Sequence, residues 1–243
     1  MPELRADADP NDALILVAFP STGAASPIAA QYLIQRLDMP LVGDIRVEGM
    51  EALVHVVDGT PTSPVRIHGG DVACEVGGPC RRTYVVSCDI PLPPESILDV
   101  AETIMAWAKD ARMVLTLDAI TRDLDDDTPD VYFVATDATA RERLAATGPA
   151  PLAQALMGGA SAALLAAGRG RTAGALVVEA RKDHPDGRAA AALIEALDPL
   201  IPQIAIDAAP LMEEAMALEQ HILRSVADAE EAQSPRRPGH TFI

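Results

Sequence analysis

The sequence predicts an α/β fold in which helices cover both faces of a central sheet. Residues 13–19 form a short, almost uninterrupted apolar run, which is typical of a strand buried on both faces. A turn with Pro20 and Gly23 follows, and after it an apolar segment with helical spacing. A buried strand, a tight turn and a helix are the opening of an α/β unit. With 243 residues, the chain is also long enough to bury a sizeable core.

The remaining elements follow from the same periodicities. Strands are predicted at residues 41–47, 52–57, 64–67, 83–88, 113–117, 131–136 and 173–180, and helices at 93–110, 138–146, 152–167, 186–200 and 209–232. Short links between the strands of residues 41–67 predict an antiparallel excursion before parallel winding resumes. Ser26 is expected to N-cap the first helix with Pro27 at its first position, and Asp186 is expected to N-cap a later helix.

We predict a single domain over residues 13–232. Residues 1–12 carry several aspartates and no periodic apolar pattern, so they are predicted to be a flexible lead-in. Residues 233–243 include Pro235, Pro238 and Gly239 and are predicted to be a flexible tail.

Charge and composition exclude several classes of partner. The net charge of −17 argues against nucleic acid and anionic membranes, and no apolar run reaches the roughly 18 residues of a membrane span. Lysine is rare among the 19 basic residues, and acidic residues are spread along the chain. This suits a halophilic, acid-coated protein of a high-salt cytoplasm, and a GC-rich genome explains it equally well. Three cysteines without a secretory leader favour a reduced cytoplasm.

The turn after the first strand is the candidate ligand site. Ligands of open α/β sheets bind beyond the carboxyl ends of strands, near helix N-termini, which indicates Ser21, Thr22, Gly23 and Ser26. The turn lacks both the Gly-x-Gly-x-x-Gly pattern and the lysine of phosphate-binding loops. A bound small anion and a purely structural turn are therefore the two hypotheses, and the second is favoured.

Two further segments resemble catalytic motifs only in part. Gly159-Ala160-Ser161-Ala162-Ala163 lacks the last glycine of a nucleophile elbow and lies in an alanine-rich helix, which favours a hydroxyl packed on a helix. His184 lies near Lys182 and Asp186, which is also the pattern of a polar loop before a capped helix.

No metal or cofactor is predicted. His68, Cys74 and Cys80 lack the paired spacing of zinc ligands. The run Asp123 to Asp127 begins like a calcium loop but continues without its glycine and its bidentate glutamate, which favours a solvated acidic loop.

Several segments in fixed order resemble one family. They are Ala18-Phe19-Pro20-Ser21-Thr22-Gly23 with residues 28–34, Pro64-Val65-Arg66-Ile67, residues 87–95, Val134-Ala135-Thr136-Asp137, residues 158–165 and residues 185–191. Together they resemble the PAC2 family, the proteasome assembly chaperones and their archaeal and bacterial relatives. Relatives often carry glycines where this chain has Ser21 and Ser26. The serine side chains make close approach of a phosphate to the backbone less favourable here.

The resemblance implies a phosphorylase/hydrolase-like three-layer sandwich with a mixed, mostly parallel sheet. It also implies a non-catalytic assembly chaperone that binds proteasome α-subunits and forms homo-oligomers. The apolar stripe of the helix expected at 209–232 agrees with self-association. The alternative is a small-ligand-binding protein or an enzyme on the same nucleoside-phosphorylase-like fold. The absence of a complete catalytic constellation in the sequence favours the chaperone.

The last three residues carry a second prediction that depends on the resemblance. Proteasome activators and some assembly chaperones end in a hydrophobic–Tyr–any motif whose carboxylate docks between α-subunits. Thr241-Phe242-Ile243 is similar to it, but Thr241 is only partly hydrophobic and Phe242 lacks the tyrosine hydroxyl. A weakened docking contact and an end without a partner are the two hypotheses for these residues.

Overall fold

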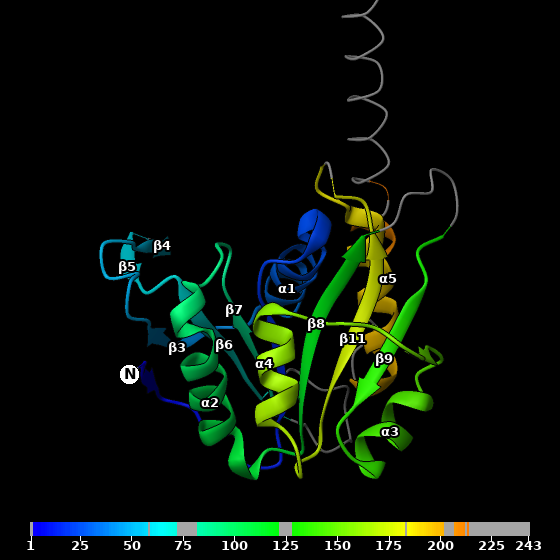
Figure 1. The fold of residues 1–243 in the computed structure, drawn as a ribbon. Helices are drawn as coiled ribbons and strands as arrows, with labels where there is room; N and C mark the ends of the chain where they lie inside the picture. The colour runs from blue at the N-terminus through cyan, green and yellow to red at the C-terminus, as the bar shows by residue number, and fades with distance from the viewer. Residues whose placement is uncertain are drawn as a thin grey trace, which may run out of the picture.

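The computed structural model describes residues 2–57, 59–71, 82–121, 128–182, 184–201, 207–211 and 213, and it is organised around a central sheet (Figure 1). The sheet strands are β1 (Glu3–Ala6), β2 (Leu14–Ala18), β3 (Leu41–Arg46), β6 (Val65–Asp71), β7 (Arg82–Ser87), β8 (Met113–Thr121), β9 (Val131–Ala135), β10 (Ala150–Pro151) and β11 (Ala173–Ala180). The helices are α1 (Ala25–Arg36), α2 (Ile97–Trp107), α3 (Ala138–Ala145), α4 (Gly159–Ala167) and α5 (Gly187–Leu197). A separate hairpin consists of β4 (His55–Val57) and β5 (Thr60–Thr62).

The strands follow the order β1-β3-β6-β7-β2-β8-β11-β9-β10. The four central strands β7, β2, β8 and β11 are parallel, whereas β1, β3 and β6 run antiparallel on one side and β9 runs antiparallel to β11 on the other. This arrangement confirms the predicted mixed sheet, including the antiparallel excursion between the first helix and β7. The apolar run that opens the fold lies in the middle of the sheet.

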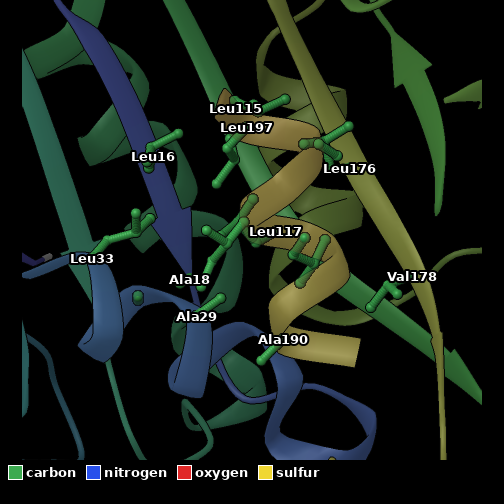
Figure 2. Close-up of a cluster of buried hydrophobic side chains, with 14 of the residues drawn as sticks. Leu16, Ala18, Ala29, Leu33, Leu115, Leu117, Leu176, Val178, Ala190 and Leu197 are labelled. Atoms are coloured by element: carbon green, nitrogen blue, oxygen red, sulfur yellow. The ribbon is translucent and has the colours of Figure 1, made fainter. Parts of the chain in front are cut away.

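Two hydrophobic cores lie on opposite faces of the sheet. Because successive side chains of a strand alternate between faces, Leu14, Leu16 and Ala18 pack on one side and Ile15 and Val17 on the other. The first core is covered by α1 and α5, and the second by α2 and α4. Figure 2 shows the first core, with Leu16, Ala18, Leu115, Leu117, Leu176 and Val178 from the strands and Ala29, Leu33, Ala190 and Leu197 from the helices. The predicted three-layer sandwich is confirmed.

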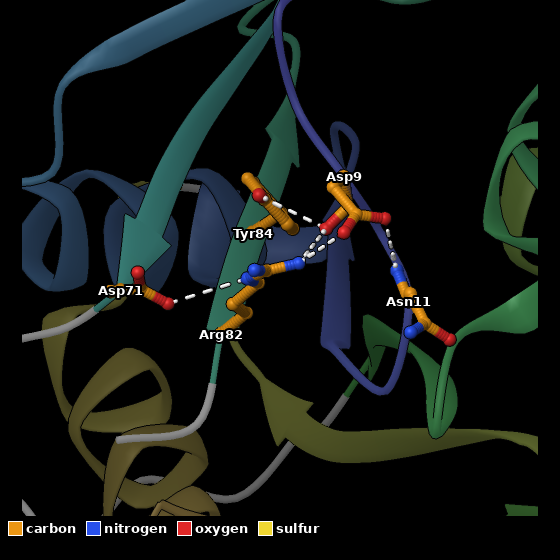
Figure 3. A network of polar contacts seen from close by, with 5 residues as sticks. All are labelled: Asp9, Asn11, Asp71, Arg82 and Tyr84. Atoms are coloured by element: carbon orange, nitrogen blue, oxygen red, sulfur yellow. Dashed lines mark hydrogen bonds and ion pairs between the residues drawn. The ribbon is translucent and has the colours of Figure 1, made fainter.

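The N-terminal segment is more ordered than its composition predicts. Residues 3–6 form β1, which pairs with β3, so the flexible lead-in predicted for residues 1–12 is wrong there. The following loop is held by Asp9, which makes an ion pair with Arg82, while the Tyr84 hydroxyl donates to the Asp9 carbonyl at 3.2 Å (Figure 3). Arg82 also lies 3.4 Å from Asp71. The partners of β1 and of Asp9 named above lie 37 to 75 positions away in the chain, so a local pattern does not reveal them.

Two predicted helix starts are wrong. Ser26 lies inside α1, and Ala24, with a left-handed φ of 50°, precedes the helix. The helix predicted from residue 152 begins at Gly159: Leu152 donates to the Phe133 carbonyl at 2.9 Å, and Gly158, just before the helix, has an extended backbone. The Asp186 cap is confirmed, since its carboxylate accepts from the Ala189 N–H at 3.0 Å.

Most of the helix predicted at 209–232, the tail at 233–243 and the loop Asp123 to Asp127 lie outside the described residues. Across the parts of the chain that the structure describes, no helix combines the length and the apolar character that crossing a membrane requires.

Candidate functional site

The parallel central strands place their carboxyl ends at one edge of the sheet. In Figure 1 the arrow of β8 points towards this edge and that of β9 points away from it. The loop of residues 20–26 follows β2 there, and the loop of residues 181–186 follows β11. These loops form the edge at which open α/β proteins bind ligands.

The four predicted ligand residues are brought together in the first of these loops. The Ser26 hydroxyl donates to the Ser21 Oγ at 2.9 Å, and the Ser26 N–H donates to the same oxygen at 3.1 Å. Ser26 is fully buried, and residues 22–24 form a 3₁₀ turn. Ser21 Oγ therefore accepts a backbone N–H hydrogen bond at the start of α1, which is the role that the sequence predicts for Ser26.

Gly23 fixes this loop against the loop after β11. Its φ is 61°, and a Cβ atom at this position would lie 2.5 Å from the Arg181 carbonyl oxygen. The Gly23 carbonyl accepts from the Asp186 N–H at 2.7 Å, and the Asp186 carboxylate accepts from the Arg181 N–H at 2.9 Å. These contacts give the loop a structural role, and ligand binding by Ser21, Thr22, Gly23 and Ser26 stays a prediction.

Ser161 lies at the first turn of α4 and is buried. Its Oγ is 3.0 Å from the Thr116 hydroxyl, and it also hydrogen-bonds to the Asp118 carboxylate on β8. Burial raises the pKa of Asp118, and hydrogen bonds from the Ala119 N–H and the Ser161 hydroxyl oppose this shift. The predicted packed hydroxyl is confirmed.

The residues considered as metal ligands do not form a site in the described ranges. Cys74 and Cys80 lie outside those ranges, and His68 lies in β6. The described residues contain no cluster of three or more potential metal ligands. His184 is partly exposed, and its Nδ1 lies 3.2 Å from the Pro185 carbonyl oxygen. Thr241, Phe242 and Ile243 are outside the described residues as well.

A buried arginine on β6, paired with an exposed aspartate, was not found by the sequence analysis. Arg66 is only 2% exposed, and its Nη2 lies 2.7 Å from Asp89 Oδ2 in the loop after β7. His68 lies on the same face of β6, and burial together with the Arg66 charge lowers its pKa to about 4. The available signal was the alternation of Arg66 and His68 with the apolar Val65 and Ile67.

The fold and this site define a class of protein: a three-layer α/β sandwich whose strand-end loops are fastened to one another, with buried polar residues on one face of an antiparallel extension. The chain belongs to the PAC2 family, whose model matches residues 15–226. The family predicted from the resemblance is therefore confirmed.

Solved structures with the same fold cover nearly the whole chain. PbaA of Pyrococcus furiosus, an archaeal homolog of proteasome-assembly chaperone, is 26% identical over 96% of this chain and 94% of its own, with a TM-score of 0.82. PbaB of Pyrococcus furiosus, an archaeal proteasome activator, is 19% identical over 93% of this chain and 98% of its own, with a TM-score of 0.77. A PAC2 family protein from Streptomyces avermitilis is 20% identical over 93% of this chain and 100% of its own, with a TM-score of 0.67. A comparison with curated proteins gives no match.

Proposed function

We propose that the protein is a non-catalytic proteasome assembly factor that binds proteasome α-subunits. The observation that carries this proposal is the likeness to PbaA, at 26% identity and a TM-score of 0.82 over almost the full length of both chains. The internal hydrogen bonding of the loop at residues 20–26 supports a non-catalytic role, because Ser21 and Ser26 satisfy each other.

The proposal is tested by capturing purified α-subunits on the tagged full-length chain. Because the chain carries a net charge of −17, it can bind basic surfaces weakly and non-specifically. An unrelated protein of similar charge is therefore the control. The measurement is made at about 0.1 M and 1 M salt, where the screening length falls from about 10 Å to about 3 Å. Specific capture at both salt concentrations is expected, and capture no better than the control would refute an assembly role.

The proposed partner contact at Thr241, Phe242 and Ile243 has its own test. Deleting these three residues removes the aromatic ring and the carboxylate that would dock between α-subunits. The expected result is α-subunit binding weakened about tenfold, the loss of roughly one charge-assisted hydrogen bond, with unchanged circular dichroism. Equal binding by the truncated and full-length chains would exclude this docking role without affecting the wider proposal.

We also propose that the protein forms homo-oligomers, which the apolar stripe in the sequence of residues 209–232 supports. Light scattering at low and high salt is the measurement. A monomer at both salt concentrations would contradict self-association.

A further inference from the structure

The large apolar side chains that are exposed among the described residues gather at one edge of the molecule. They lie in the loop after β3, in β4, in the loop after β7, in the first turn of α2 and just before α4. Both β3 and β7 run antiparallel to β6, so they end at the same edge, and α2 and α4 begin there (Figure 1). We call these side chains the apolar rim: Leu53, Val54, Val56, Ile90, Leu98 and Leu156.

Contacts between the segments make the apolar rim a connected surface. The Ser96 hydroxyl donates to the Glu48 carbonyl at 2.9 Å, and His55 Nε2 lies 3.6 Å from Asp89 Oδ2. These contacts join the loop after β3 and the hairpin to the loop after β7. The helices α2 and α4 pack against each other in the second core. Single exposed apolar side chains are ordinary on a protein, whereas a gathered set marks an interaction surface.

Leu156 is the most exposed member of the apolar rim. Its exposed fraction is 102%, and its neighbours Ala153 and Ala155 are exposed as well. The segment of residues 152–158 runs from β10 to the start of α4, and its backbone is held where Leu152 donates to the Phe133 carbonyl (Figure 1). A leucine in this position adds nothing to the core of the chain, so burial against another molecule is where its apolar surface would contribute.

The charges of the segments that contain the apolar rim have one sign. Residues 47–64, 83–108 and 144–168 include seven acidic residues and no lysine or arginine, although the whole chain has 19 basic residues for 36 acidic ones. Glu95, Asp99 and Glu102 are exposed around the start of α2. Two copies that met through this surface would bring like charges together, which disfavours self-association here. The complementary partner is an apolar patch flanked by lysine and arginine.

We infer that the apolar rim is the surface through which the chain binds an α-subunit, at an apolar patch of the α-subunit that is flanked by basic side chains. The inference rests on the proposed function and names the face of the chain that carries it out. It does not involve residues 241–243, so the two contacts are tested separately.

The test is the affinity of purified α-subunits for the full-length chain at about 0.1 M salt. Leu98→Asp and Leu156→Asp each place a carboxylate in the proposed interface, and each is expected to weaken binding at least tenfold. Both side chains are exposed, so circular dichroism should be unchanged. Ala106→Asp is the matched control: it adds the same charge at an exposed position near the other end of α2 and should bind as the wild type does.

A double variant, Glu95→Lys with Asp99→Lys, tests the charge of the partner. It should weaken binding several-fold at about 0.1 M salt and much less at about 1 M salt, where the screening length falls from about 10 Å to about 3 Å. Tighter binding of this variant at the lower salt concentration would overturn the assignment of a basic partner.

The outcomes separate this inference from the function on which it rests. Wild-type chain that does not bind α-subunits would overturn both. Wild-type binding that Leu98→Asp and Leu156→Asp leave unchanged would overturn the inference alone. Light scattering of the same variants tests the other occupant: dissociation of a homo-oligomer by Leu98→Asp or Leu156→Asp would show that the apolar rim joins copies of this chain, and the α-subunit assignment would fail.

Discussion

The two ends of α1 bury polar groups in opposite ways. Beside its N-terminal end, the hydroxyls of Ser21 and Ser26 hydrogen-bond to each other, and the Gly23 carbonyl accepts from the Asp186 N–H at the end of the loop after β11. Near its C-terminal end, Arg66 Nη1 and His68 Nδ1 are buried and have no hydrogen-bond partner among the described residues. The first region has its hydroxyls and its backbone paired internally, whereas the second keeps buried polar atoms without a hydrogen-bond partner in the described ranges. A place at the strand ends is therefore not by itself a sign of a free binding site.

The largest effect is expected at Gly23. In Gly23→Ala, the new Cβ would lie 2.5 Å from the Arg181 carbonyl oxygen, and the φ of 61° is unfavourable for alanine. We expect the free energy of unfolding to fall by about 3 kcal/mol, measured by urea denaturation.

Gly170→Ala separates the contact from the backbone strain. Gly170 has a φ of 81° but nothing within 4 Å of the position that a Cβ would occupy, so only the strain remains, about 1 kcal/mol. Equal losses in the two variants would show that the N-terminal end of α1 is not tightly packed, and the comparison would fail.

An intermediate effect is expected for the pH dependence of stability at His68. The pKa of this imidazole is about 4 in the folded protein and near 6.5 when unfolded, mainly because of burial and then because of the Arg66 and His55 charges, with Asp89 opposing. Between these values the unfolded chain binds more protons, so stability rises with pH and is lost as the pH falls from 6.5 towards 4. We expect about 1–2 kcal/mol from this group after allowance for solvent screening.

His68→Asn should remove this part of the pH dependence in urea denaturation measured across that window. His55→Asn is the matched comparison. Burial also lowers the pKa of His55, but 42% of its side chain is exposed, so His55→Asn should change the pH dependence of stability less than His68→Asn does. A His68→Asn curve that parallels the wild type would indicate that His68 is already hydrated or protonated in the folded protein.

The smallest effect is expected from two serine-to-alanine variants, which should differ in sign. Ser26→Ala removes a buried hydroxyl that donates to Ser21, and should lower the free energy of unfolding by about 1 kcal/mol. Ser87→Ala removes a buried hydroxyl without a partner among the described residues, and should raise it by up to about 1 kcal/mol. Similar losses in both variants would show that Ser87 is paired in solution and would weaken the contrast between the two regions.

Much of the fold could be predicted because its central elements are defined locally. The run at β2 and the apolar strand at β11 are buried along almost their whole length, as their composition predicts. The start of α4 could not be predicted, because alanine and leucine before Gly159 favour a helix, whereas Leu152 hydrogen-bonds to Phe133 of β9 instead. Strand β1 was missed for a similar reason: it is stabilised by pairing with β3, about 40 residues away in the chain.

The candidate sites were predicted less completely. The turn after β2 was found because its composition and its place after a strand are local features. The surroundings of Arg66 were not, because they depend on its ion pair with Asp89, 23 residues away in the chain, and on residues of α1 that lie beside it. Sequence alternation indicates which face of a strand a residue shares, but not whether a helix covers that face fully.

The two outermost strands of the sheet, β1 and β10, determine how copies of this protein can meet. At one edge, β1 places Glu3 and Arg5 in an exposed ion pair with a 2.7 Å separation, and charged side chains there discourage pairing with another strand. At the other edge of the described sheet, β10 has two residues, and Pro151 has no amide hydrogen to donate. Growth of the sheet from one copy into the next is therefore disfavoured at both ends. Assemblies of this chain are therefore expected to join through helical surfaces and not by extension of the sheet.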